Sequence, residues 1–540
     1  MTQAQSASSY WQVPEQFNFA RDVIDMLARE DRLGLVFLDK NGSERRYSFP
    51  EIARESARYA AALRELGIAK GDKVLVVIPK RPEWLFTMLA LLRIGAVSVP
   101  SSEQLRAKDL LFRADHSEAT AAISFVSLAG EFDVMRADAK TVRHWISIGG
   151  ERPGWTPLEP LAAKAGDGWL GEATRRDEPA FLVYTSGTTK DPKGVLHAHA
   201  YTYAKRMQAE LWLDARRDDL VWCSAGTGWA KSLWNVLLGP WSCGSAIVLH
   251  EGAFEPTERM NLLERLGVTV LCQAPTEYRL EAKLEGLGTR WKLERLRHAV
   301  SAGEPLNPEV IKVFKDAYGI TIYDGYGQTE NSLIVANLPG MIVRPGSMGK
   351  PTPGHDVQIV DEDGNICAEG VVGDIALKDR PPTLFVEYYK NPQETANAFR
   401  GSYYLTGDRA TRDADGYLWF VGRADDVISS AGYRIGPFEV ESALLTHPAV
   451  KESAVVGSPD PDRGNIVKAF VVLREGYAAT PQLIGELQEH CKRETAPYKY
   501  PREIEFVNDL PKTSSGKIRR VELRQRELQR KGATRASGFV

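Results

Sequence analysis

Apolar and polar positions follow two different periods along the chain. The segment "SFPEIARESARYAAALRELG" repeats apolar residues at helical spacing, begins after Ser48 and closes at Gly67, so it predicts an amphipathic helix. "DKVLVVIP" is a continuous apolar run, which is typical of a buried strand, and "FLVY", "SAIVL" and "VTVLCQAP" repeat that pattern between helical segments. The alternation predicts an α/β fold in which helices flank parallel sheets.

The most apolar stretch, "WLFTMLALL", predicts a buried helix that leads into the strand "AVSVP". It runs from Trp84 to Leu92 and is interrupted by Arg93. A membrane span needs about 18–20 apolar residues, so no membrane span is expected here.

The pattern changes near residue 420, where "GRADDVISSAGYRIGPFEVESALLTHPAVKESAVV" mixes charges and glycines with a strand and a helix. The strand "KAFVVL", the helix "TPQLIGELQEHCKRETA" and the strand "REIEFV" follow it. These elements predict a small α+β domain of ordinary size. We place the boundary within Gly422 to Asp426, which gives a large N-terminal domain with several sheets (1–424) and a C-terminal domain (425–540).

Length and composition agree with this division. A chain of 540 residues exceeds what one hydrophobic core usually supports. With 43% hydrophobic residues, 26% charged residues and a net charge of −3, we expect a soluble protein without a basic surface for nucleic acid. The first thirty residues carry acids and no apolar core, so no signal or transit peptide is expected. The five cysteines form no C-x-x-C pair and suit a reducing cytoplasm: Cys223, Cys243, Cys272, Cys367 and Cys491.

The stretch "YTSGTTKDPKG" follows the predicted strand "EPAFLVY" and carries the strongest hint of chemistry. Glycines let backbone N–H groups point at a phosphate, hydroxyls donate hydrogen bonds, and lysines add positive charge. The same residues also dominate ordinary surface loops, and the stretch by itself leaves both interpretations open. It is not a Walker A motif, because Gly194 follows Lys193 where that motif requires Ser or Thr.

Three further segments add to this loop: "YDGYGQTE", "LTGDRATRDADGYLWFVGRADD" and "LPKTSSGKIRR". Together they resemble the AMP-forming acyl-CoA synthetases, which share a superfamily with luciferases and peptide-synthetase adenylation domains. The resemblance runs from about Tyr47 to about Glu527. The C-terminal half looks most like medium-chain acyl-CoA synthetases, notably in "SSAGYRIGPFEVESALLTHPAVKESAVVGSPDPDRG" and "APYKYPREIEFV".

The resemblance implies a carboxylic acid–CoA ligase that uses ATP, Mg²⁺ and coenzyme A. A carboxylate resists attack by a thiol because it is anionic and lacks a leaving group. Transfer to AMP, with release of pyrophosphate, supplies one, and a thiol then displaces AMP. The first step joins two anions, so it calls for cations and directed N–H donors.

The resemblance also assigns nucleotide-binding roles to individual residues. It implies that the phosphate loop holds the β- and γ-phosphates, that Tyr326 stacks on adenine, that Thr329 contacts the α-phosphate, and that Glu330 binds Mg²⁺. Asp408 is expected at the ribose hydroxyls, together with Arg423. The loop departs from the family at Lys190 and Asp191, and we interpret Lys190 as solvent-facing. The remaining nucleotide-binding residues are Thr185, Ser186, Gly187, Thr188, Thr189, Lys193, Gly303, Glu304, Pro305, Asp324, Gly327 and Gln328.

The small domain is expected to be mobile and to serve both half-reactions. The resemblance implies that Lys517 reaches the carboxylate and the α-phosphate during adenylation, and that Asp425 is the hinge. Gly432, with Arg434 in the same "SAGYR" motif, is expected to line the path of the CoA pantetheine.

The acyl pocket is expected to be walled by "TGWAKSLW" (Thr227 to Trp234), which contains Trp229 and Lys231, by Ala302 and by Gly327. Acetate-specific family members carry tryptophan where this chain has Gly327, so we expect a deeper cavity and a small-to-medium or aromatic acid as substrate. We interpret Lys231 as outward-facing surface charge, because burial of an unpaired lysine is costly.

Several alternatives stay open at this point. An adenylating ligase that loads a carrier-protein thiol, an oxygenating luciferase and a non-catalytic nucleotide-binding protein are the rival functions. His197 and His199 in "VLHAHA" do not share a helix face and have no evident acidic partner, so we assign them a structural role. Two hypotheses concern partners: a homo-oligomer, and an acetyltransferase–deacetylase pair that acts on Lys517.

Overall fold

The computed structural model divides the chain into two compact units. The large unit comprises Met1–Asp356 and Asp379–Phe399, and the small unit comprises Val357–Lys378 and Arg400–Val540. The division predicted at 424/425 falls inside the small unit by this grouping, so it stays a prediction about the hinge. The structure describes residues 11–185, 192–304, 306–423, 426–430, 433–460, 463–495, 497–512 and 518–537.

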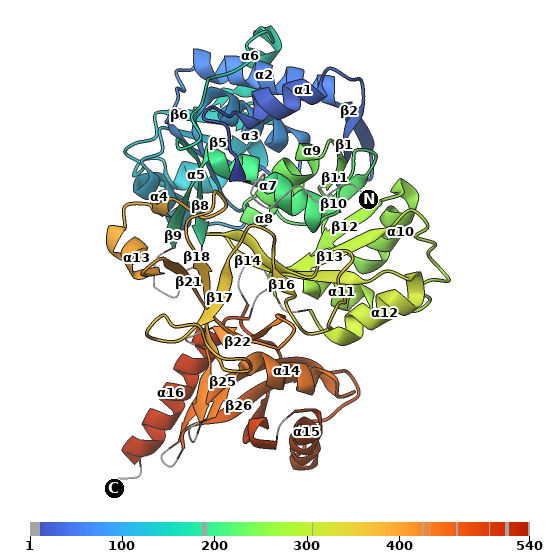
Figure 1. Cartoon of the computed structure of the whole chain (residues 1–540). Coiled ribbons are helices and arrows are strands. Elements are labelled where there is room, and N and C mark those ends of the chain that lie inside the picture. Colours follow the sequence, from blue (N-terminus) through green and yellow to red (C-terminus); the bar gives the residue numbers. More distant parts are fainter. Residues whose placement is uncertain are drawn as a thin grey trace. The chain divides into compact units, whose positions relative to one another are not determined.

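Two large sheets form the framework of the large unit, as the alternating pattern predicts (Figure 1). The nine-stranded sheet has the spatial order β16 (Lys350–Pro351), β15 (Ser332–Ala336), β14 (Ile322–Gln328), β13 (His298–Ala302), β12 (Val270–Gln273), β10 (Leu220–Cys223), β11 (Ala246–His250), β1 (Leu33–Leu38) and β2 (Glu44–Ser48). The eight-stranded sheet has the order β19 (Glu387–Tyr388), β9 (Lys193–Ala198), β8 (Pro179–Thr185), β4 (Val97–Pro100), β3 (Lys73–Val77), β5 (Ala121–Phe125), β6 (His144–Ile148) and β7 (Thr156–Pro157).

The two helices that the apolar pattern predicts in the large unit are present as α2 and α3. Ser48 caps α2, and its N–H donates to the Glu51 carboxylate at 2.7 Å. α3 ends at Gly95, whose φ of 77° favours glycine. The helices are α1 (Asp25–Leu27), α2 (Phe49–Glu65), α3 (Pro82–Ile94), α4 (Ala107–Ser117), α5 (Gly130–Met135), α6 (Leu158–Lys164), α7 (His199–Leu211), α8 (Ala230–Ser232), α9 (Gly239–Ser242), α10 (Pro256–Leu266), α11 (Pro275–Glu281), α12 (Pro308–Tyr318) and α13 (Pro392–Asn397), with the π-helical segments η2 (Ala20–Ile24) and η4 (Leu233–Leu238) and the 3₁₀ segment η3 (Val126–Leu128).

The predicted apolar helix over Trp84 to Leu92 is α3, and it packs against α2 in the core. Arg93, which interrupts the apolar run, is buried and pairs with Asp25 at 2.7 Å. Among the described residues, no helix combines the length and the apolar character that a membrane crossing requires.

Parallel strands of the nine-stranded sheet bring the predicted site segments to one edge. β10, β12, β13 and β14 pair in parallel, so their carboxyl ends share a side. The loops after these strands contain Trp229, Gly303 and Thr329. Ligands of parallel sheets bind at this edge, which makes it the place to look for the site.

The small unit contains three further sheets. Its first sheet includes β17 (Val357–Val360), β18 (Gly373–Lys378), β21 (Tyr403–Arg412) and β22 (Leu418–Arg423), and β20 (Phe399–Arg400) falls where the chain enters this unit. The others are β23 (Ile428–Ser430) with β24 (Tyr433–Ile435), and β25 (Val450–Asp460) with β26 (Gly464–Leu473) and β27 (Glu503–Phe506). The helices are α14 (Pro437–Leu445), α15 (Pro481–Glu494) and α16 (Arg520–Ser537), with the short turn η5 (Pro497–Lys499).

Alternate residues of β25 and β26 face two separate cores, because successive side chains of a strand point to opposite faces. Val455 and Val471 belong to the core that includes residues of α14 and α15. Phe470 belongs to a smaller core that Leu523 of α16 completes.

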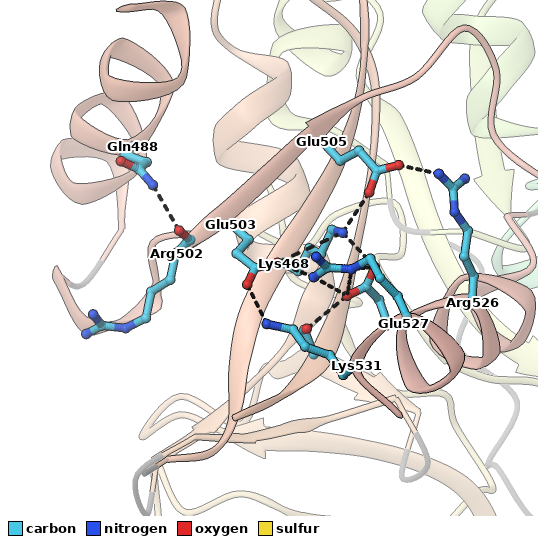
Figure 2. A network of polar contacts seen from close by, with 10 residues as sticks. Lys468, Gln488, Arg502, Glu503, Glu505, Arg526, Glu527 and Lys531 are labelled. Carbon is cyan, nitrogen blue, oxygen red and sulfur yellow. Dashed lines mark hydrogen bonds and ion pairs between the residues drawn. The ribbon is translucent and has the colours of Figure 1, made fainter. Parts of the chain in front are cut away.

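α16 is also attached to the sheet by a buried polar network (Figure 2). Lys468 on β26 donates to Glu527 on α16 at 2.6 Å and to Glu505 on β27 at 2.7 Å. Ser458 on β25 also donates to Glu527, at 2.9 Å. The side chains of Lys468 and Glu527 are 3% and 0% exposed. Each therefore compensates the charge of the other, which water does not reach.

We expect Lys468→Met to loosen α16 by roughly 3 kcal/mol, because Glu527 then keeps a buried charge without its ammonium partner. Hydrogen exchange of the α16 amides measures this local stability. The double variant Lys468→Met/Glu527→Leu is the control and should recover most of the loss. Equal exchange in the single and double variants would contradict the prediction.

The same network predicts an acid-sensitive α16. Burial opposes ionisation of Glu527, but hydrogen bonds from Arg530, Lys468 and Ser458 outweigh it and lower the pKa of Glu527. The contribution of Glu527 to the stability of α16 is therefore fully present above the ordinary pKa of glutamate. It is lost as the pH falls through the lowered pKa of the folded protein.

Candidate active site

The predicted phosphate loop connects two antiparallel strands of the eight-stranded sheet. The predicted strand "EPAFLVY" is β8, which confirms that prediction, and Thr185 at its end pairs with Lys193 at the start of β9. Ser186, Gly187, Thr188, Thr189, Lys190 and Asp191 lie outside the described residues. The structure therefore describes only the two ends of the loop, Thr185 and Lys193, which are paired across β8 and β9.

Lys193 is held by a carboxylate and lies over an aromatic ring. Its Nζ forms an ion pair with Glu394 on α13 and lies 5.0 Å from the centre of the Tyr388 ring. Tyr388 reaches Lys193 because β19 pairs with β9, with Tyr388 opposite Val195.

Tyr388 also contacts Glu330, the predicted metal ligand. Its hydroxyl donates to Glu330 Oε1 at 3.0 Å, and the Phe385 N–H donates to the Glu330 carbonyl at 2.7 Å. One aromatic ring therefore joins a predicted phosphate-binding cation to a predicted metal-binding anion. Sequence reasoning missed Tyr388 and Glu394, because nothing in "EYYKNPQET" marks them as functional. Only strand pairing reveals them.

Thr329 is tied to the neighbouring hairpin by His197. His197 is buried, and its Nε2–H donates to the Thr329 carbonyl at 2.8 Å. Burial, reinforced by the charge of Lys205, lowers the pKa of His197 to about 3, and burial lowers that of His199 to about 4. Both rings are neutral at physiological pH, which agrees with the structural role predicted for them.

The turn between β14 and β15 requires glycine at position 327. A Cβ atom placed on Gly327 would lie 1.6 Å from the Ser332 carbonyl oxygen, inside the backbone of the neighbouring strand. The expectation that Gly327 marks a deeper cavity needs correction here, because the missing side chain points at β15 and permits close pairing of two strands. The turn continues with a hydrogen bond of 2.9 Å from the Gln328 N–H to Asn331.

The carboxyl groups of Asp324 and Glu304, two other predicted nucleotide-binding residues, already have partners within the large unit. Asp324 on β14 is buried and accepts a hydrogen bond from the Gly325 N–H at 3.0 Å. Burial raises the pKa of Asp324 to about 7, against hydrogen bonds that lower it. Glu304 pairs with Arg279 at 2.9 Å, and Gly303 before it has a φ of 111°. Tyr326 lies on β14, and Pro305 lies outside the described residues.

Lys231 points inward, contrary to the interpretation as surface charge. Its Nζ donates to the Ala302 carbonyl at 3.0 Å, at the end of β13. The predicted cost of burial is offset by this hydrogen bond, because an ammonium with an acceptor is no longer unpaired. Trp229 stands directly before α8 as its N-cap residue, two positions from Lys231. Lys231 and Ala302, two predicted acyl-pocket residues, are therefore in contact.

In the small unit, the predicted ribose ligands Asp408 and Arg423 face each other. They come from the two ends of the segment "LTGDRATRDADGYLWFVGRADD" and are partners in the register of β21 and β22. Asp408 is buried, and its N–H donates to Thr406 Oγ1 at 3.2 Å. The backbone of Arg434 pairs with Ser429 across β23 and β24. Asp425, Gly432 and Lys517 lie outside the described residues.

The donor set near Glu330 fits a cation that takes most of its ligands from phosphate. Within the described residues there is no group of three or more His, Cys, Asp or Glu side chains that could enclose a metal ion. Mg²⁺ typically binds through one or two carboxylates plus substrate phosphates and water, so a single glutamate is compatible with it.

Comparisons with known proteins agree with this geometry. A model of the AMP-binding enzyme family matches residues 27–389, and a model of the AMP-binding enzyme C-terminal domain matches residues 439–517. The chain is 48% identical over 525 residues to the uncharacterized acyl-CoA ligase YtcI of Bacillus subtilis, covering 97% of this chain and 98% of that one. It is 44% identical over 532 residues to the mitochondrial acyl-coenzyme A synthetase ACSM3 of Mus musculus, covering 96% and 91%.

A solved structure extends the similarity to the fold. The anthranilate CoA ligase AuaEII, in complex with anthranoyl-AMP, is 30% identical and superposes with a TM-score of 0.89, covering 98% of this chain and 100% of that one. The family models, the ligase relatives and the shared fold agree with each other and with the motifs. The chain therefore belongs to the AMP-binding enzyme family and is an AMP-forming carboxylic acid–CoA ligase, which activates its acid with ATP and transfers the acyl group to CoA.

Proposed function

We propose that this ligase activates a small-to-medium or aromatic carboxylic acid, with the polyphosphate of ATP bound between Lys193 and Glu330. The observation that carries the proposal is the Tyr388 side chain, whose ring lies under the Lys193 ammonium while its hydroxyl donates to Glu330. An aromatic ring in this position keeps the cation and the carboxylate close without letting them neutralise each other.

Lys193 supplies positive charge to the leaving pyrophosphate. The charge of the β- and γ-phosphates grows as the bond to the α-phosphate breaks, so a nearby ammonium stabilises the transition state more than the ground state. Without bound nucleotide, the Lys193 ammonium forms an ion pair with the Glu394 carboxylate. A phosphate oxygen must therefore replace Glu394 as the partner of Lys193.

Glu330 would hold Mg²⁺, and the Tyr388 hydroxyl would orient the Glu330 carboxylate. When bound, Mg²⁺ shields the negative charge of the polyphosphate. The hydrogen bond from the Tyr388 hydroxyl to Glu330 Oε1 fixes the orientation of the carboxylate that would bind the cation. The Phe385 N–H fixes the backbone of the same residue.

The acid would bind beside Ala302, Trp229 and Lys231. The contact between Lys231 and the Ala302 carbonyl supports this location, because it draws the α8 segment to the carboxyl end of β13. The structure of the anthranilate CoA ligase AuaEII holds anthranoyl-AMP, the adenylate of an aromatic acid, which supports the aromatic part of this range.

Thioester formation would use the small unit, with Lys517 serving adenylation and Gly432 the path of CoA. Asp408 and Arg423 would bind the ribose. A cytoplasmic location, a homo-oligomer and acetylation of Lys517 stay predictions of the sequence.

We expect Glu394→Gln to bind pyrophosphate and ATP about two- to fivefold more tightly, because the phosphate no longer competes with a carboxylate for Lys193. Titration calorimetry with the full chain measures the affinity. Glu118→Gln is the matched control: it removes an acid that pairs with Lys390 instead of Lys193. An equal gain in both variants would reduce the effect to net charge, and weaker binding in Glu394→Gln would show that Glu394 positions Lys193.

We expect Lys517→Ala to abolish most acyl-adenylate formation while thioester formation from supplied acyl-adenylate persists. A bulky Gly432→Leu should do the reverse, because it obstructs the path of the thiol. Pyrophosphate release and thioester formation are measured separately. Damage to the same half-reaction in both variants would refute a two-conformation mechanism.

We expect kcat/KM to rise several-fold per carbon from acetate upward until the site is filled, since each buried methylene contributes about 0.8 kcal/mol. A series from acetate to octanoate with benzoate tests this. Trp229→Ala should move the optimum toward bulkier acids. Substitution at Gly327 is unsuitable for this test, because any side chain there collides with Ser332. A sharp optimum at acetate would be incompatible with the proposed substrate class.

A further inference from the structure

Lys205 on α7 is a buried lysine without a hydrogen-bonding partner. The residue is 1% exposed, and its Nζ has no partner in the part of the chain that the structure describes. Removal of an amine from water without a compensating acceptor is costly. Lys468 and Lys231, by contrast, both reach acceptors. Lys205 therefore calls for an explanation that packing does not supply.

Its surroundings are aromatic and basic. Nζ lies 3.7 Å from the centre of the Tyr201 ring and 4.6 Å from that of the Trp234 ring, so two ring faces stabilise a positive charge in part. Burial lowers the pKa of Lys205 well below its ordinary value. The charge of Lys205 in turn adds to burial in lowering the pKa of His355. In the described residues, no carboxylate forms an ion pair with Lys205.

The Trp234 indole is a second donor beside Lys205. Its Nε1 is buried, although the Trp234 side chain is only half-buried overall, and its side chain interacts with that of Tyr201. The Lys205 ammonium has no such acceptor within the described residues. A buried amine that lacks an acceptor suggests that the acceptor comes from a ligand.

Packing connects the pair with the proposed acyl-binding residues. Trp234 follows Lys231 by three positions on one helical segment, so the two share a face. Lys205 shares a face of α7 with Gln208, which donates to Asn235 at 2.8 Å. Gln208 also accepts from Ser332 at 2.7 Å, at the turn next to Gly327. Lys205 is therefore linked through Trp234 to the segment of Lys231 and through Gln208 to the turn of Gly327.

We propose that Lys205 and the Trp234 indole form a subsite for an acceptor oxygen at the far end of the acyl group. The substrate is then a carboxylic acid that carries a remote hydroxyl, ketone or second carboxylate. This inference rests on the proposed function, because it needs the acid to bind beside Lys231. The alternative is a lysine that only packs against the two rings.

Paired substrates test the subsite. Hexanoate, heptanoate and octanoate are each compared with the ω-hydroxy acid, the terminal methyl ketone and the dicarboxylate of matching length. Turnover is measured by pyrophosphate release. The proteins compared are the native chain, Lys205→Met, Lys205→Gln and Lys231→Met. We expect one acceptor-bearing acid to exceed its alkanoate at least about tenfold in kcat/KM, because a buried donor discriminates strongly against a partner that cannot accept. Lys205→Met should abolish that preference while alkanoate turnover persists.

The preference is the ratio of the kcat/KM values that one variant shows for the two acids of a pair. A smaller fraction of folded protein lowers both values equally and leaves the ratio unchanged. Lys205→Gln keeps a donor and should retain part of the preference. If no acceptor-bearing acid exceeds its alkanoate, or if the preference survives in Lys205→Met and disappears in Lys231→Met, the subsite is refuted while the ligase function stands. If no acid at all releases pyrophosphate, the proposed function fails and the subsite fails with it.

Discussion

The antiparallel pairing of β9 with β8 on one side and β19 on the other is the constraint on which the site depends. Pairing with β8 sets Lys193 opposite Thr185 at the ends of the phosphate loop. Pairing with β19 brings Tyr388 from almost two hundred positions away in the chain to the same lysine. A shift of one residue in either register would turn these side chains to the other face of the sheet. The site therefore inherits its geometry from backbone hydrogen bonds.

Three lysines show how the surroundings of an ammonium group determine its use. Lys193 is partly exposed and pairs with one glutamate, which water screens and a phosphate can displace. Lys468 is buried between carboxylates that compensate its desolvation, so it attaches a helix to a sheet. Lys205 is buried without an acceptor. The same side chain thus attaches a helix at Lys468, and it is proposed to bind phosphate at Lys193 and a substrate oxygen at Lys205, according to its partners and its access to water.

Glycine at the site acts through the backbone more than through the space that it leaves. The close approach of Gly327 to Ser332 lets the strand after Tyr326 turn back at once, which brings Glu330 to the Phe385 N–H. A comparison of side-chain volumes at this position predicts a cavity, whereas the direction of the missing Cβ indicates a strand contact. Lys231 illustrates the same limit. Its inward orientation follows from an acceptor, the Ala302 carbonyl, that belongs to a distant strand.

The sequence by itself determined the alternating α/β architecture, the helix limits at Ser48 and Gly67, the strand before the phosphate loop and the family of the enzyme, because periodicity, capping residues and contiguous motifs are local properties. Only the tertiary structure revealed the contacts of Tyr388 and Glu394 with Lys193, the surroundings of Lys205, the inward turn of Lys231 and the reason for glycine at position 327. These depend on which strands pair and on which acceptors burial leaves within reach. Contacts between residues that are far apart in the chain have no signature in any single segment.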